Sequence, residues 1–319
     1  MPISPDLQTI REARELLDRY LPITRTVSAQ SLSAPGMAVH LKLEMELPTG
    51  SFKPRGALYA LAMNLARRRV EEVTASSTGN HGAAVAFAAK TLGIPATIFL
   101  PSKPNPVKRQ KIRDLGARIV ETGSVDLAGA FQEASLYSAR PGVYFLNDAT
   151  DPDVPVGTAT IGLEIIEQIP EVSAVYVPMG DTALIRGVGA AIKLLLPKVR
   201  VVGVQAERAP SYYFSWKEGR VVPTDSCDTC ADGLATRTPE ALNVLAIREL
   251  VDDVVLVSED QILGAIAHLY REEGVLAEPA GAAATAAFIA SPPRDLRCAV
   301  LMVTGANISE DVKDRACVL

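Results

Sequence analysis

Apolar and polar residues follow two periods along this chain, and one of them is the period of a strand. From Val39 to Met45 every second residue is apolar, with His40, Lys42 and Glu44 between them. A period of two predicts a strand with one buried face and one face in water. We therefore expect these three polar side chains to be exposed.

A helical period opens the chain. Ser4 and Pro5 form a typical helix start, with the serine as N-cap and the proline in the first turn. The apolar residues that follow lie three or four positions apart, at Leu7, Ile10, Ala13 and Leu17. The pattern predicts an amphipathic helix capped by Ser4.

Residues 72–149 alternate between the two periods. Strand patterns and helix patterns succeed each other there, which predicts a parallel sheet with helices on its faces. The expected strands are 72–77, 95–101, 117–123 and 143–148, and the expected helices are 79–93, 105–116 and 126–139.

A second alternating series follows residue 149. It predicts helices at 160–169, 187–196 and 258–274 and strands at 174–179, 200–206 and 298–305. Residues 210–239 show no strong period and are expected to form a long surface loop. Two α/β sheets side by side predict a ligand cleft between them, at the carboxyl ends of the strands.

Composition and charge narrow the function classes. The chain has 319 residues, of which 48% are hydrophobic, and this is enough for a large core. A net charge of −5 argues against a general nucleic-acid binder, which needs a basic surface. No signal-peptide pattern and no apolar run long enough to span a bilayer are visible, so a cytoplasmic protein is expected.

The cysteines and histidines do not suggest a metal site or a disulfide framework. There are four cysteines and three histidines, and the pair Cys227 and Cys230 has no second CxxC or paired histidine to complete a zinc site. We expect both thiols to be buried or in a loop, and we expect no metal site.

Lys53 is the first residue with candidate chemistry. It lies between Phe52 and Pro54 at the start of a helical pattern, where the helix dipole disfavours an ammonium group. Loss of solvation there is expected to lower the pKa of Lys53 and to make a neutral, nucleophilic amine accessible, as in lysines that form Schiff bases. The alternative is a lysine that extends past Phe52 into water.

Three further motifs lie where strands end. The segment "SSTGNHG", residues 76–82, leaves backbone N–H groups open for an anion such as a carboxylate. The segment "VPMGDTALIRGVG", residues 177–189, suits a phosphate at a helix N-terminus, although the carboxylate of Asp181 would repel it unless turned away. The last strand delivers Thr304 and then Gly305.

In order and spacing, these motifs resemble the pyridoxal-phosphate enzymes of the threonine/serine dehydratase family. The resemblance covers nearly the whole chain and includes the segments 231–239, 251–262 and 277–287. It implies an α/β fold of two open twisted sheets, that of fold type II (tryptophan synthase β-like). The implied domains are a large cofactor-binding domain (1–71 and 150–319) and a small domain (72–149) that closes over the substrate.

The resemblance also assigns roles to residues. Lys53 matches the lysine that holds the cofactor and later removes the Cα proton, and Phe52 matches the residue that packs the ring. Asn80 matches the contact to the ring hydroxyl, and Thr304 matches the hydroxyl that faces the pyridine nitrogen. The phosphate loop corresponds to Gly180, Asp181, Thr182, Ala183 and Leu184, and the substrate carboxylate loop to Ser77, Thr78, Gly79 and His81.

The implied activity is elimination of water from a hydroxy amino acid, giving a 2-oxo acid and ammonia. Threonine and serine are the default substrates, and a specialised member, such as the dehydratase of hydroxyectoine breakdown, has a similar pattern. The family also implies a cytoplasmic homodimer that acts on a small amino acid, without nucleic acid or membrane.

Three departures from the family pattern keep alternatives open. Asp181, Thr182 and Ala183 replace a run of glycines, so a non-catalytic pyridoxal-phosphate-binding paralogue is one alternative. A hydroxyl at Thr78 resembles the serine of racemases, so an amino-acid racemase is another. Near Glu207, residues 211–213 replace the metal carboxylate of the family, and the tyrosines Tyr212 and Tyr213 are expected to shape a roomier substrate pocket.

Overall fold

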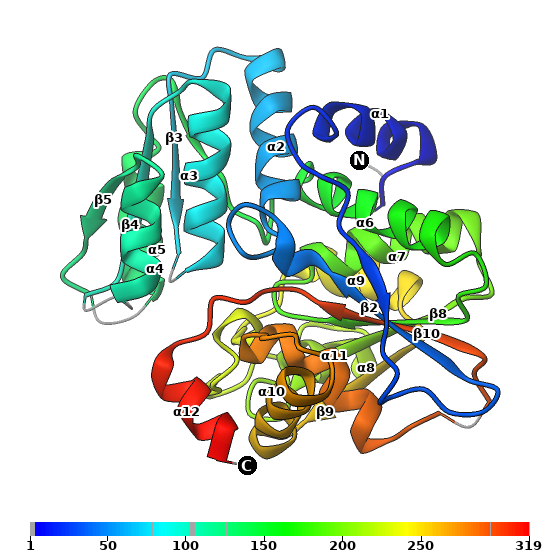
Figure 1. Cartoon of the computed structure of the whole chain (residues 1–319). Coiled ribbons are helices and arrows are strands. Elements are labelled where there is room, and N and C mark those ends of the chain that lie inside the picture. The colour runs from blue at the N-terminus through cyan, green and yellow to red at the C-terminus, as the bar shows by residue number, and fades with distance from the viewer. Residues whose placement is uncertain (1–3, 78, 103–105, 125–126, 294, 319) are drawn as a thin grey trace.

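The strands form two sheets in the computed structural model, which describes residues 4–77, 79–102, 106–124, 127–293 and 295–318 (Figure 1). The six-stranded sheet has the order β1-β2-β10-β7-β8-β9, and only its edge strand β1 is antiparallel to its neighbour. Its strands are β1 (Thr26–Ser28), β2 (Ala38–Leu43), β7 (Ala174–Pro178), β8 (Arg200–Ala206), β9 (Asp253–Val257) and β10 (Cys298–Val303).

The four-stranded sheet is wholly parallel, with the order β5-β4-β3-β6. Its strands are β3 (Glu72–Ser76), β4 (Ala96–Leu100), β5 (Arg118–Glu121) and β6 (Val143–Phe145). All four lie within the strand ranges that the sequence predicted. The α/β fold with a parallel sheet is therefore confirmed.

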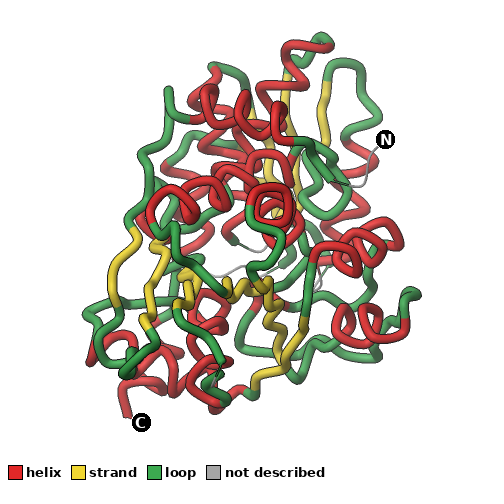
Figure 2. Tube along the Cα trace, turned by 90° about the vertical axis from the view of Figure 1, so that its right-hand side faces the viewer, coloured by secondary structure: helices red, strands yellow, loops and turns green. Residues whose placement is uncertain are grey.

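Helices surround the strands of both sheets (Figure 2). The first seven α-helices are α1 (Leu7–Leu17), α2 (Pro54–Arg67), α3 (Asn80–Leu92), α4 (Pro106–Asp114), α5 (Leu127–Tyr137), α6 (Val154–Gln168) and α7 (Ala183–Leu195). The others are α8 (Ser211–Glu218), α9 (Ala241–Leu250), α10 (Glu259–Glu272), α11 (Pro279–Ala290) and α12 (Glu310–Val318), with short 3-10 turns η1 (Glu44–Glu46) and η2 (Asp232–Leu234). Among the described residues, no helix is long and apolar enough to cross a membrane.

The first helix begins later than expected. Asp6, and not Ser4, is the N-cap of α1, because its carboxylate accepts a hydrogen bond from the backbone N–H of Thr9 at 2.8 Å. Ile10, Ala13 and Leu17 are buried, as the helical spacing predicted.

The half-buried strand is the larger error. Val39, Leu41 and Leu43 are buried as expected, but Lys42 and Glu44 are fully buried too. Alternation gives the wrong exposure here because these two charged side chains are paired with opposite charges from elsewhere in the chain. A period of two describes apolar positions and cannot detect such partners.

The segment 210–239 is more ordered than a surface loop. It contains α8 and η2, and Ser211, Tyr212 and Ser215 are buried. The hydroxyl groups of Ser211 and Ser215 donate to backbone carbonyl oxygens. These hydrogen bonds order the segment without leaving a periodic pattern of apolar residues in the sequence.

One hydrophobic cluster joins the N-terminal helices to the four-stranded sheet. Leu17 of α1 and Leu58 of α2 belong to the same buried cluster as Val73 of β3 and Ala84 of α3. The core thus continues across residue 72, where the sequence placed a domain boundary. The division at 72 and 149 stays a prediction.

Candidate active site

A cavity lies between the two sheets, where strands of both end. Ser76 at the end of β3, Pro178 at the end of β7 and Thr304 just after β10 contribute to its wall. Parallel sheets place ligand sites at the carboxyl ends of their strands, and the position of this cavity agrees with that rule.

Twelve of the thirteen residues that the sequence singled out line this cavity. They are Phe52, Lys53, Ser77, Gly79, Asn80, His81, Gly180, Asp181, Thr182, Ala183, Leu184 and Thr304. Thr78 lies outside the described residues. Residues more than 250 positions apart therefore meet in one place, although their individual roles stay predictions.

Lys53 begins helix α2 and does not extend into water. It is the N-cap of α2, and its ammonium group donates to the carboxylate of Asp148. Burial alone would lower the pKa of Lys53, but the charge of Asp148, together with Asp181 and Glu278, outweighs burial, and the pKa is raised. The expected fall is wrong, because the expectation from burial and the helix start did not include the acidic residues that the fold brings beside this amine.

Backbone hydrogen bonds fix Lys53 relative to the end of β10. The N–H of Phe52 donates to the carbonyl oxygen of Thr304 at 3.0 Å, and Ser51 forms an isolated bridge with Gly305. The amine and the Thr304 hydroxyl therefore approach the cavity from a shared scaffold.

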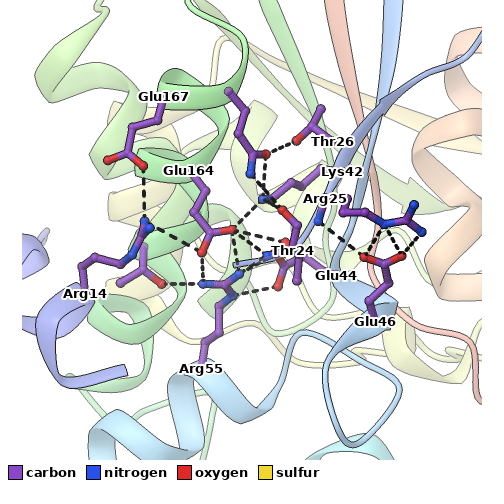
Figure 3. Close-up of polar contacts among 12 residues, drawn as sticks. Arg14, Thr24, Arg25, Thr26, Lys42, Glu44, Glu46, Arg55, Glu164 and Glu167 are labelled. Atoms are coloured by element: carbon purple, nitrogen blue, oxygen red, sulfur yellow. Dashed lines mark hydrogen bonds and ion pairs between the residues drawn. The ribbon is translucent and has the colours of Figure 1, made fainter. Parts of the chain in front are cut away.

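A buried ionic network anchors the first turn of α2 (Figure 3). Arg55 donates to Glu44 at 2.8 and 2.9 Å and to Glu164 of α6 at 2.7 and 2.9 Å. Lys42 donates to the same Glu164 at 2.6 Å. All four side chains are at most 2% exposed, so their charges are neutralised by one another and not by water.

The loop between β3 and α3 carries polar groups with defined orientations. The Ser77 hydroxyl accepts from the N–H of Gly79 at 3.0 Å. The amide of Asn80 donates to Glu278 at 2.6 Å and accepts from Asn307 at 2.7 Å. Asn80 is thus held at the cavity wall from two sides.

The predicted phosphate loop has an unusual backbone. Thr182 adopts the left-handed conformation with φ 68°, the single non-glycine residue with positive φ among those described. This conformation costs roughly 1–2 kcal/mol for residues with a side chain. The loop therefore keeps the shape that glycines favour, even though its sequence departs from a glycine run.

Gly180 is needed in this loop for a different reason. A Cβ atom there would lie 2.3 Å from the carbonyl oxygen of Gly233 in η2. No side chain can be accommodated at this distance without displacement of η2.

Asp181 turns its carboxylate toward a threonine. The hydroxyl of Thr236 donates to it at 2.9 Å. Burial, and then the charge of Asp148, raise the pKa of Asp181. This orientation partly removes the objection that the sequence raised.

Several cavity residues were not identified from the sequence. Asp148, Asp232 and Glu278 line the cavity, and Thr236 positions Asp181. Asp148 is the last residue of the expected strand 143–148, so the strand-end rule could have suggested it.

Residues 211–213 are not part of the cavity wall, and the expectation that the tyrosines among them shape the pocket is wrong. Tyr212 is buried, and its hydroxyl contacts Glu240 and Asn243.

The cysteine and metal predictions have different outcomes. Cys227 and Cys230 are free thiols that pack partly buried against the core, as expected. The absence of a metal site stays a prediction. Within the described ranges, His40, Glu171 and Cys298 place possible ligand atoms within 4.8 Å of one another, and no sequence spacing indicated this group.

Comparison with known proteins places the chain in a family. A family model described as pyridoxal-phosphate dependent enzyme matches residues 18–305. The chain belongs to the pyridoxal-phosphate-dependent enzymes. An L-threonine ammonia-lyase of Thermotoga maritima is 37% identical over 310 residues, which cover 97% of this chain and 77% of that protein.

Solved structures of this family share the fold. Maize serine racemase has a TM-score of 0.91 at 28% identity, covering 99% of this chain and 97% of that one. The T.th. threonine deaminase has a TM-score of 0.88 at 32% identity, covering 96% of this chain and 99% of that one. The predicted fold type II architecture is confirmed.

The residues of the cavity fit pyridoxal phosphate. An amine, a ring-sized apolar neighbour in Phe52 and a loop at the start of α7 line the same space. The buried hydroxyl of Thr182 has no hydrogen-bond partner within the described part of the chain, and a phosphate oxygen would satisfy it. These observations support the cofactor that the family assigns.

Proposed function

We propose that this chain is a pyridoxal-phosphate-dependent dehydratase that acts on a β-hydroxy amino acid. The convergence of Lys53, the loop 180–184 and Thr304 on one cavity carries the proposal. The sequence identity of 37% to an L-threonine ammonia-lyase supports this reaction class. The products are a 2-oxo acid and ammonia.

The residues would divide the work as follows. Lys53 would hold the cofactor, the N–H groups and hydroxyl of loop 180–184 its phosphate, and Thr304 the ring nitrogen. The loop 77–81 would bind the substrate carboxylate through its backbone N–H groups. When bound, the cofactor withdraws electrons from Cα and so eases loss of the proton and of the β-hydroxyl group.

Lys53 would take the Cα proton, and the hydroxyl would leave as water. Hydrolysis of the released enamine takes up one water, so the net reaction converts the hydroxy amino acid into 2-oxo acid and ammonium. A base must be neutral to accept a proton, and the ion pair of Lys53 with Asp148 opposes that state. Lys53 must therefore leave Asp148 before it can act.

A screen of β-hydroxy amino acids for 2-oxo acid release tests the proposal. We expect turnover by the wild type and none by Lys53→Ala, with Lys90→Ala as the control on an exposed lysine. Formation of only the D-enantiomer would favour the racemase alternative, which the similarity to maize serine racemase supports. A protein that binds the cofactor but converts no substrate would favour the non-catalytic alternative.

Finer assignments belong to the same proposal. We propose that the protein is a cytoplasmic homodimer that binds neither nucleic acid nor a membrane. The region 72–149 would close over the substrate. The substrate would be a specialised one, such as a compound of hydroxyectoine breakdown. Light scattering in solution tests the dimer. Comparison of threonine and serine with larger hydroxy amino acids tests the substrate.

A further inference from the structure

The cavity wall carries more negative than positive charge. Four carboxylates line it, from Asp148, Asp181, Asp232 and Glu278, and among the described residues of the wall only Lys53 brings an ammonium group. An amino acid substrate with one amine and one carboxylate adds no net charge. Asp232 and Glu278 interact with further groups, so Asp148 is the carboxylate to consider, and its neutralisation changes during the proposed reaction, on which this inference rests.

Asp148 loses its cation when the enzyme is at work. In the structure its carboxylate is neutralised by Lys53. When Lys53 is neutral and ready to accept a proton, it no longer supplies a positive charge to Asp148. The carboxylate side chain is only 14% exposed, so water compensates little of the loss.

His81 adds a second acceptor beside Asp148. Its Nε2 lies 2.9 Å from the carbonyl oxygen of Leu146, and since a carbonyl only accepts, Nε2 is the donor. Nδ1 lies 3.6 Å from the Asp148 carboxylate. In the neutral ring it is an acceptor, and in the protonated ring it forms an ion pair with Asp148. Nδ1 is buried without a hydrogen-bond partner among the described residues, and its residue is 8% exposed and lines the cavity.

Two acceptors side by side fit a ligand group with several N–H donors. An ammonium group has three donors and a positive charge, so it can bond to both Asp148 and His81. The other acids are less suited: Glu278 accepts from Asn80, and Asp181 accepts from Thr236. Asp148 is therefore the carboxylate that a ligand cation would reach.

We propose that the substrate is a β-hydroxy amino acid with a second amine on its side chain, and that Asp148 and His81 bind this amine. The substrate cation would replace Lys53 as the partner of Asp148. Lys53 would then be free of the ion pair that keeps it protonated, so that binding of the correct substrate prepares the base. A neutral side chain such as that of threonine supplies no positive charge to Asp148.

The first test compares substrates on the wild-type holoenzyme. We expect kcat/KM for 2,4-diamino-3-hydroxybutanoate to exceed that for threonine by about 10- to 100-fold, the usual range for a hydrogen bond to a charged group. Acetylation of the side-chain amine removes the charge and is expected to abolish the advantage. Equal or better turnover of threonine would overturn the inference, while the proposed function would stand.

The second test changes the acceptor. Asp148→Asn is expected to reduce the ratio of kcat/KM for the diamino substrate to kcat/KM for threonine by about 10-fold or more. Asp228→Asn, on an exposed carboxylate, is the matched control and should leave the preference unchanged. An equal loss with both substrates would contradict a role for Asp148 in cation binding.

Binding without turnover separates the two proposals. Calorimetric titration of the holoenzyme with 2,4-diaminobutyrate and 2-aminobutyrate, which have no β-hydroxyl to eliminate, should show about 10-fold tighter binding of the diamine. Equal affinities would overturn the inference. Release of no 2-oxo acid from any hydroxy amino acid would overturn the proposed dehydratase, and the calorimetric preference would still decide the cation site.

Discussion

Glu164 is the residue on which the buried ionic network at the first turn of α2 depends most. It accepts hydrogen bonds from Arg55, Lys42 and Thr24, and it is 1% exposed. Lys42 and Arg55 carry two positive charges, and Glu44 and Glu164 two negative charges. Glu164→Gln keeps the shape of the side chain but leaves one positive charge unneutralised in the protein interior.

The expected loss of stability follows from that count. Removal of one partner from a buried ion pair costs about 3–5 kcal/mol. For a chain of 319 residues, an unfolding entropy of roughly 2.1 cal/mol/K per residue gives about 0.7 kcal/mol for each degree of Tm. Glu164→Gln should therefore lower Tm by about 4–7 °C.

Scanning calorimetry of the cofactor-free protein at a fixed scan rate measures this shift. Glu167→Gln is the matched control on the same helix, because its side chain is 62% exposed, and its Tm should change by less than about 1 °C. Lys42→Met combined with Glu164→Gln restores neutrality and should recover at least half of the loss. A shift below about 2 °C for Glu164→Gln, or no recovery in the double variant, would refute the network's role.

The effect should also depend on pH in a defined direction. Burial would raise the pKa of Glu164, but Arg55 and then Lys42 lower it below its ordinary value of 4.5. A carboxylate with a lowered pKa contributes its stability above the ordinary value, and the contribution is lost as the pH falls through the folded-state value. The difference in Tm between wild type and Glu164→Gln should therefore be complete at neutral pH and narrow below about pH 4.5.

Two further predictions concern the phosphate loop. Gly180→Ala should weaken cofactor binding at least about 10-fold in an absorbance titration, because its Cβ would lie 2.3 Å from the Gly233 oxygen. The control is Gly264→Ala, whose Cβ meets no atom within 4 Å and which should stabilise α10 by about 0.5–1 kcal/mol. Equal behaviour of the two variants would contradict the crowding at Gly180. Asp181→Asn should bind the cofactor at least about 3-fold more tightly, because the change removes a carboxylate from the phosphate loop while the amide oxygen can still accept from Thr236. Weaker binding would show that the Asp181 carboxylate supports the loop.

The alternating block 72–149 could be predicted because apolar periodicity reports burial directly. Strands β3 to β6 follow period two or short apolar runs, and the structure has them where the sequence placed them. The motif residues of the site could also be predicted, because glycines and hydroxyls at strand ends mark backbone suited to anions. Gly180 and Thr304 follow from this rule, Lys53 follows from its position at a helix start, and the three residues meet in the cavity.

The charged groups could not be predicted with the same success, because their exposure depends on distant partners. Lys42 was expected in water, yet it pairs with Glu164, which lies 122 positions away. Lys53 was expected to have a lowered pKa, and Asp148, 95 positions away, reverses the shift. Periodicity contains no information on which opposite charges the fold brings together.

The covalent attachment of the cofactor to Lys53 is the central claim, and peptide mass spectrometry tests it most directly. Holoenzyme reduced with sodium borohydride and then digested should carry the pyridoxyl phosphate mass on the peptide that contains Lys53, and Lys53→Ala should carry it nowhere. Attachment at another lysine, or an unmodified Lys53 peptide from protein saturated with cofactor, would contradict the account.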